Sequence, residues 1–144
     1  PFYPGQVMVR TPAAQPAITD VSGQHVGLGA IVAPNACAFY AGDMGRVFAV
    51  LTGNMVASNT ATTQTGRLAY GTGAAPANAT EQTGTLVGIA QSFVAVTGHL
   101  TMPLAVSAVI PGLTAGTLYW IDLVITSSAT SGQLTNAVLT VFEI

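Results

Sequence analysis

Short runs of apolar residues, many of them β-branched, recur along this chain and are separated by glycine, proline and small polar residues. This pattern favours many short strands over helices, and no window has the spacing of an amphipathic helix. Turn-prone pairs such as Gly53-Asn54 and Pro111-Gly112 mark several of the breaks. We therefore expect an all-β domain. The predicted strands are Gln6–Arg10, Ala17–Val21, Gly29–Val32, Arg46–Leu51, Met55–Ser58, Leu86–Val96, Leu100–Val109, Leu118–Thr126 and Asn136–Glu143.

The predicted strand Leu118–Thr126 is apolar on both of its faces. Alternation along a strand places Trp120 and Asp122 on one face, and Tyr119 and Ile121 on the other. Such a strand is normally covered on both sides, so we expect a second sheet over one face and a neighbouring subunit over the other. A carboxylate buried there must meet a cation or several hydrogen-bond donors, and an arginine across a subunit boundary would serve. We hypothesise that Asp122 pairs with one of the arginines.

The chain has 144 residues, which matches a single domain. Prolines at positions 1, 4, 12 and 16 disfavour a helix and a central strand, so residues 1–16 are predicted to form an extended Pro-rich N-terminal arm. Residues 17–144 then form a single β-sandwich domain. Residues 58–82 are rich in small and polar residues, and we expect a long surface loop or a weak hairpin there.

The scarcity of charge indicates what this domain is built for. Only three arginines and five Asp or Glu residues are present, whereas about a quarter of the residues in an average soluble domain are charged. Much of the surface must then consist of hydroxyl, amide and small apolar groups, which lose little when a neighbouring protein removes their water. We predict a subunit of a protein assembly. The alternative is a monomer kept soluble by its hydroxyl and amide groups.

Several classes of partner are disfavoured by the sequence. The net charge of −2 and the lack of a basic cluster give no footprint for nucleic acid. No apolar stretch reaches the roughly 18 residues that a membrane-spanning helix needs. The residues after Pro1 lack the pattern of a signal peptide, so the simplest expectation is synthesis in a cytoplasm.

No residue is nominated as catalytic or as a metal ligand, and no cofactor is expected. Neither His25 nor His99 has a second potential ligand at a suitable spacing. Cys37 lies in a small apolar setting and is expected to be a buried, inert thiol. The carboxylates are scattered, without the close pair that general acid and base catalysis would use. We therefore expect no enzymatic activity.

Three stretches of the sequence carry a family resemblance: Leu86–Gln91 with the alternating strand that follows it, Pro111–Asp122, and Leu139–Ile144. They resemble small virion proteins of tailed bacteriophages. Two groups are similar: capsid decoration (cement) proteins, and trimeric fibre heads with a fold like that of tumour necrosis factor and C1q. The resemblance covers about residues 84–144. It implies a jelly-roll-like antiparallel β-sandwich that forms a homotrimer on the outside of a phage head.

The leading hypothesis is therefore a decoration subunit that binds the major capsid protein and its own copies, and stabilises the capsid lattice. It would be made in the host bacterial cytoplasm and reside on the capsid surface of the virion. The alternative is the receptor-binding jelly-roll head of a tail fibre. The residues predicted to contact other chains are Phe2, Tyr3, Tyr119, Trp120, Asp122 and Phe142.

Overall fold

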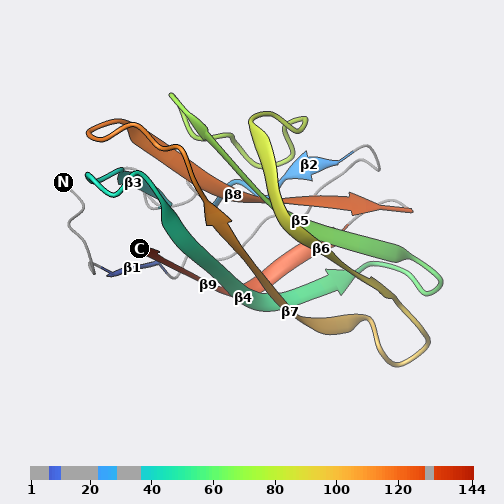
Figure 1. Ribbon diagram of the computed structural model, residues 1–144. Coiled ribbons are helices and arrows are strands. Elements are labelled where there is room, and N and C mark those ends of the chain that lie inside the picture. The colour runs from blue at the N-terminus through green and yellow to red at the C-terminus, as the bar shows by residue number, and fades with distance from the viewer. Residues whose placement is uncertain (1–6, 11–22, 29–36, 129–131) are drawn as a thin grey trace.

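The strands of the described residues form two antiparallel sheets (Figure 1). The structure is a computed structural model, and it describes residues 7–10, 23–28, 37–128 and 132–144. These residues form nine strands: β1 (Val7–Arg10), β2 (Gln24–His25), β3 (Ala38–Tyr40), β4 (Val47–Ala57), β5 (Thr63–Thr72), β6 (Thr85–Val94), β7 (Thr101–Ile110), β8 (Leu118–Ser127) and β9 (Gly132–Glu143).

The strand order is that of a jelly roll. The first sheet runs β1-β9-β4-β7, and the second runs β2-β8-β5-β6 with β3 also paired to β8. From β3 onward the chain passes back and forth between the sheets, and only β5 and β6 follow one another in the same sheet. Such a two-sheet arrangement is one of the ways in which an antiparallel all-β protein encloses a core. The predicted jelly-roll-like sandwich is confirmed.

The core lies between the two sheets. Along β4, β7 and β9, alternate side chains point inward and are shielded from water, while the others face outward. Strand β8 is buried on both faces, and β6 has no fully buried residue. Each large aliphatic side chain that is fully buried contributes about 1.5–3 kcal/mol relative to exposure. The largest of these aliphatic residues are Leu28, Leu51, Leu68, Ile110, Ile121, Leu123, Ile125, Leu134 and Leu139.

The predicted break at Gly53-Asn54 is wrong. Residues on both sides of it belong to β4, which pairs with β7 without interruption and with β9 through a register shift between Thr52 and Asn54. A bulge of this kind absorbs one extra residue and bends the strand while pairing continues. The glycine and asparagine that favour a turn in isolation are therefore accommodated within a strand.

The expected surface loop at residues 58–82 is also wrong in its middle part. Residues Thr63–Thr72 form β5, which lies between β8 and β6 in the second sheet. Gln64 and Leu68 point into the interior, and Ala69 is buried on the opposite side. Small residues fit here because large neighbours from other strands already fill the space. The prediction failed because it required large apolar residues in the strand itself.

The remaining predicted strands have mixed outcomes. Those near the N-terminus at 7–10 and in the segment 85–143 are present with small shifts of their ends. The short strands β2 and β3 were not predicted. The predicted strands Ala17–Val21 and Gly29–Val32 lie outside the described residues. Val7–Arg10, within the predicted arm, pairs with β9 at the edge of the first sheet.

Leu123→Ala tests the placement of the core. Leu123 is fully buried at the centre of β8, so its truncation leaves a cavity and should lower the free energy of unfolding by about 2–5 kcal/mol. Met44→Ala removes an exposed side chain of similar size in the turn between β3 and β4 and should change it by less than about 0.5 kcal/mol. Urea unfolding followed by tryptophan fluorescence measures both. Equal losses for the two variants would contradict this core.

Candidate functional site

Three of the residues predicted to contact other chains lie inside this chain. Tyr119, Trp120 and Asp122 of β8 are only 8%, 4% and 1% exposed. A partner has no direct access to these side chains. Phe142 of β9 is half-buried, and its ring lies 5.3 Å from that of Phe48 on β4. Phe2 and Tyr3 lie outside the described residues.

The buried carboxylate of Asp122 is held by four hydrogen-bond donors. Oδ2 accepts from the backbone N–H of Gly27 at 3.0 Å and from His25 Nδ1 at 2.9 Å. Oδ1 accepts from the backbone N–H groups of Leu28 at 3.0 Å and Leu123 at 2.9 Å. Together these donors replace the water that the carboxylate loses on burial. The predicted pairing of Asp122 with an arginine is wrong.

The hydrogen bonds also determine the tautomer of the fully buried His25. Its Nε2 faces the backbone N–H of Thr83 at 3.0 Å, and a backbone amide can only donate. Nε2 must therefore accept, while Nδ1 carries the proton donated to Asp122. The imidazole is neutral in this tautomer, and it links the segment around Thr83 to β8.

The indole of Trp120 is covered by His25 and by the segments around Thr72 and Gly84. Its ring makes an edge contact with His25 at 5.4 Å, and its Nε1 donates to the carbonyl of Thr72 at 3.2 Å. Gly84 has φ +72°, and a Cβ built there would lie 2.6 Å from the indole, so no larger residue fits. The outer face of β8 is thus covered by its own chain, where the sequence predicted a neighbouring subunit.

Asp122, His25 and Thr83 place a carboxylate, an imidazole and a hydroxyl in the order found in catalytic triads. The hydroxyl of Thr83 lies 3.3 Å from Nε2, but the lone pair of Nε2 already accepts the amide of the same residue at 3.0 Å. A general base needs that lone pair free to take a proton. We therefore assign the three residues a role in holding the fold together.

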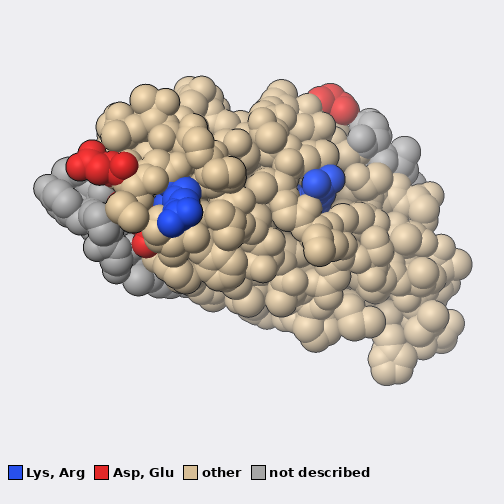
Figure 2. Space-filling view, in the orientation of Figure 1, with Lys and Arg blue, Asp and Glu red and all other residues tan. Residues whose placement is uncertain are grey.

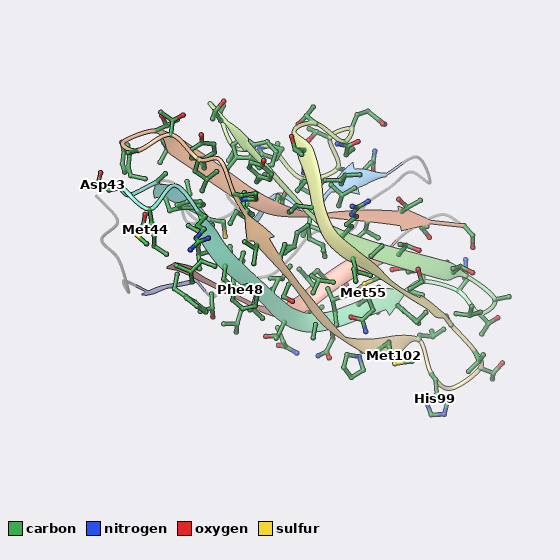
Figure 3. The ribbon with its side chains drawn as sticks, viewed as in Figure 1. Asp43, Met44, Phe48, Met55, His99 and Met102 are labelled. Atoms are coloured by element: carbon green, nitrogen blue, oxygen red, sulfur yellow. The ribbon has the colours of Figure 1, made fainter. Side chains whose placement is uncertain are left out.

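The other candidate groups for chemistry are far apart. His99 lies at the tip of the turn between β6 and β7 and points away from the body of the protein, whereas His25 is buried (Figure 3). Cys37 is buried. Within the described ranges, no three His, Cys, Asp or Glu side chains gather as metal ligands would. The described residues also contain no helix with the length and hydrophobicity needed to cross a bilayer.

The most unusual surface belongs to β6, β7 and the turn that joins them. We name the two strands, residues 85–94 and 101–110, the β6–β7 edge. Each is an edge strand of its own sheet, and they lie side by side where the two sheets meet (Figure 1). Most of the exposed large apolar side chains of the described residues lie here or in the connecting turn: Leu86, Ile89, Val94, Val96, Met102 and Val109.

A bulge in β6 pushes one apolar side chain outward. Gly66 pairs with Gln91 and Leu68 pairs with Val87, so Arg67 alone lies opposite residues 88–90. Gly88 has φ +73°, a conformation that glycine adopts readily. At the bulge Ile89 is 87% exposed. Bulges re-aim side chains at sheet edges, and this one presents an isoleucine to solvent.

Two outward backbone positions of β7 offer no free N–H group at this edge. The amide oxygen of Gln91 accepts a hydrogen bond from the backbone N–H of Ala105 at 2.9 Å. Because that N–H points away from β4, the backbone groups of every second residue point outward as well, including position 103. Pro103 has no N–H to offer there. A shallow groove of about 340 Å³ remains, lined by Ile89, Ala90, Gln91, Ala105, Val106 and Ser107.

The outer face of the first sheet carries little charge. We use this name for the outward side chains of β4, β7 and β9, which include Phe48, Val50, Thr52, Ala105, Ser107, Val109, Val138, Thr140 and Phe142. The exposed Arg46 directly precedes β4, and its Nε donates to the carbonyl of Ile144 at 2.9 Å. A sheet face in water normally carries charged and polar residues. Strands β4 and β7 contain no charged residue, and the one in β9, Glu143, is buried.

Charged groups are therefore sparse and separated on the side of the molecule shown in Figure 2, where uncharged atoms cover nearly all of the surface. The sequence contains the signal for this surface. Residues 82–121, which include all of β6 and β7, lack Asp, Glu, Lys and Arg entirely. The prediction from sequence used the low overall charge, but it did not use the complete absence of charged residues from this one segment.

Comparisons with known proteins identify the fold but no family. No family model matches the chain, and no curated protein sequence matches it. The structure of Eiger TNF from S. frugiperda aligns with a TM-score of 0.52 and 10% identity, covering 99% of this chain and 94% of that one. At this identity the similarity concerns the jelly-roll fold alone.

Structures of infectious bursal disease virus show the same fold. The Gt strain aligns with a TM-score of 0.53 and 12% identity over 96% of this chain, and the Gx strain with 0.54 and 11% over 95%. The present chain spans about a third of the length of those chains, at 33% and 32%. The neighbours are thus a TNF jelly roll and viral proteins that contain a jelly roll.

Asp122→Asn tests how much the buried carboxylate stabilises the packing of residues 23–28 against β8. The asparagine side chain has an NH₂ group where the carboxylate has its second oxygen. Two donors would then face each other, so the free energy of unfolding should fall by about 3 kcal/mol. Asp43→Asn, at an exposed position, should change it by less than about 0.5 kcal/mol. Chemical denaturation compares the two. Equal midpoints would show that the four hydrogen bonds of Asp122 contribute nothing to stability.

Proposed function

We propose that this chain is a structural subunit of a virion, a decoration protein that binds the outer surface of a phage head and stabilises its lattice. The observation that carries the proposal is the apolar surface, poor in charge, made by the β6–β7 edge and the outer face of the first sheet, where Arg46 and Arg67 are the nearby charged residues. Large exposed apolar patches on soluble proteins mark interaction sites. Such a subunit acts by adding buried contact area, and it needs no reactive group.

The fold supports this proposal at a coarser level. Jelly rolls are common in viral capsid domains, and the virus structures described above contain one. A jelly roll also serves unrelated functions, so the fold raises the expectation of a capsid-type role without deciding it. The surface poor in charge is the feature that favours assembly over an isolated role.

The partners in this proposal are the major capsid protein and further copies of the chain, as a homotrimer. A trimer presents three binding surfaces at once, and linked contacts raise the overall affinity well above that of one contact. This suits a protein that must remain on a capsid during expansion or heating. The proposed location is the capsid surface of the virion, after synthesis in the host bacterial cytoplasm.

The test uses purified heads of the phage that encodes the chain, prepared without it. The added protein should co-sediment with the heads, reach a copy number comparable with that of the capsid protein on a stained gel, and raise the temperature at which the heads release their DNA. An unrelated β-sandwich protein of similar mass serves as the control. A handful of copies per particle together with binding to host cells would instead support a receptor-binding fibre head.

A further inference from the structure

We infer that Arg67, on the outer face of the second sheet, is a binding site for one carboxylate group, and that an aspartate or glutamate of the capsid protein supplies this group. The carboxylate site follows from the contacts of Arg67 itself. The identity of the partner rests on the proposed function, because it names the group on the capsid that this chain recognises.

Arg67 lies on the side of β5 that faces away from the core. Its neighbours along the strand, Gly66 and Leu68, point inward and are buried, whereas Arg67 is half-buried. Across the sheet it pairs with Val124 of β8 on one side, and residues 88–90 of the β6 bulge lie opposite it on the other. The cation is therefore set among uncharged neighbours on both adjacent strands.

One hydrogen bond fixes the guanidinium of Arg67 in place. Its Nε donates to the carbonyl of Gly88 at 2.9 Å. The remaining N–H groups, on the two Nη atoms, form the planar fork that matches the two oxygens of a carboxylate. Among the described residues, the ion pair between side chains joins His25 and Asp122, so no described carboxylate occupies this fork.

The acidic residue on the same face of the sheet is already satisfied. Asp122 lies two residues from Val124 along β8, and its oxygens accept the four hydrogen bonds described above. Its side chain is also buried beneath residues 23–28. A carboxylate for Arg67 therefore has to come from outside the described part of the chain.

Hydroxyl groups on the same face provide further donors. Thr65 is the next outward residue of β5, and its hydroxyl lies 2.6 Å from that of Ser92, its pairing partner on β6. Thr126 of β8 pairs with Thr65 from the other side and is exposed. One proton of the Thr65–Ser92 pair lies between the two oxygens, and the other can be donated to an anion. An anion at this place meets one cation and several neutral donors.

A single cation favours a carboxylate over a nucleic acid. Proteins that bind a phosphate backbone neutralise several phosphates at once with a group of cations. Residues 82–121, which include the neighbouring strand β6, supply no cation. One guanidinium can instead form a bidentate pair with one carboxylate, which adds geometric specificity to the charge attraction.

The position of Arg67 beside Ile89 indicates that the carboxylate belongs to a protein. Arg67 bonds the residue that directly precedes Ile89, the exposed side chain at the bulge. A protein interface of ordinary size covers about 800 Å² on each partner, so a protein that packs on Ile89 also covers Arg67. A guanidinium buried without a partner is strongly unfavourable. A protein that binds here must therefore place an aspartate or glutamate against Arg67.

A titration with acetate tests the site without any partner. Acetate replaces chloride at constant ionic strength, and ¹⁵N–¹H correlation spectra follow the Nε–H of Arg67 and the amides of residues 88–92. These signals should saturate with half-saturation at roughly 10–100 mM, as expected for hydrogen bonds to a charged group. Arg67→Gln should abolish the saturable response. The Nε–H of the exposed Arg46, which bonds the Ile144 carbonyl, should shift without saturating.

Variants of Arg67 test the partner on purified heads that lack the chain. Arg67→Gln and Arg67→Glu both lose the bond to Gly88 and differ in charge, so a purely structural role predicts equal effects. We expect Arg67→Gln to weaken binding at least about thirtyfold, and Arg67→Glu to weaken it about tenfold further by repulsion. Circular dichroism and the urea midpoint verify folding.

Arg46 is the matched control for these variants. Arg46→Gln and Arg46→Glu make the same changes of charge and lose an equivalent bond from Nε to a carbonyl. Because Arg46 is exposed, its charge stays hydrated, and each variant should weaken binding to heads less than about threefold.

Other outcomes overturn the inference in separate ways. A lack of saturation with acetate refutes the carboxylate site, and the proposed function still stands if wild type binds heads. Equal binding of heads by wild type and Arg67→Gln refutes the capsid carboxylate. Equal weakening by Gln and Glu would show that Arg67 only holds the bulge. A wild type that ignores heads refutes the proposed function and this partner, while saturation with acetate still supports the carboxylate site.

Discussion

The rest of the structure depends on the burial of β8 on both of its faces. One face is covered by the first sheet, and the other by residues 23–28 and the segment around Thr83, which the carboxylate of Asp122 and the imidazole of His25 hold in place. Because the chain supplies this cover itself, its most apolar strand is not open to a partner. Among the described residues, the apolar surfaces that remain exposed are the β6–β7 edge and the outer face of the first sheet.

These two surfaces reconcile an apolar exterior with a single native state. Exposed edge strands invite unspecific pairing, yet here Gln91 caps a backbone amide, Pro103 removes another, and the bulge at Gly88 interrupts the ladder. At positions 103 and 105, β7 therefore presents side chains without a free backbone N–H group. The function proposed above requires this property, because unspecific strand pairing leads to aggregation.

Sequence reasoning succeeded where side-chain pattern and local geometry agree, as in β7 and β8. It failed where residues distant in the sequence decide whether a segment is buried. Thr63–Thr72 has few large apolar residues, but it is an interior strand because Trp120 covers Ala69 and the core covers Gln64 and Leu68. Asp122 was recognised as a buried charge that needs partners. Its actual partners, three backbone amides and a histidine distant in sequence, leave no local signal.

The sequence by itself determined that the chain is all-β and that its surface lacks the charge of an ordinary monomer. These properties follow from composition and from alternation along each strand, which are local. Only the tertiary structure decided which apolar residues are hidden and which are presented. Trp120 and Ile89 are both large and apolar, but one is enclosed by the chain and the other projects from a bulge, because exposure depends on what lies opposite a residue in space.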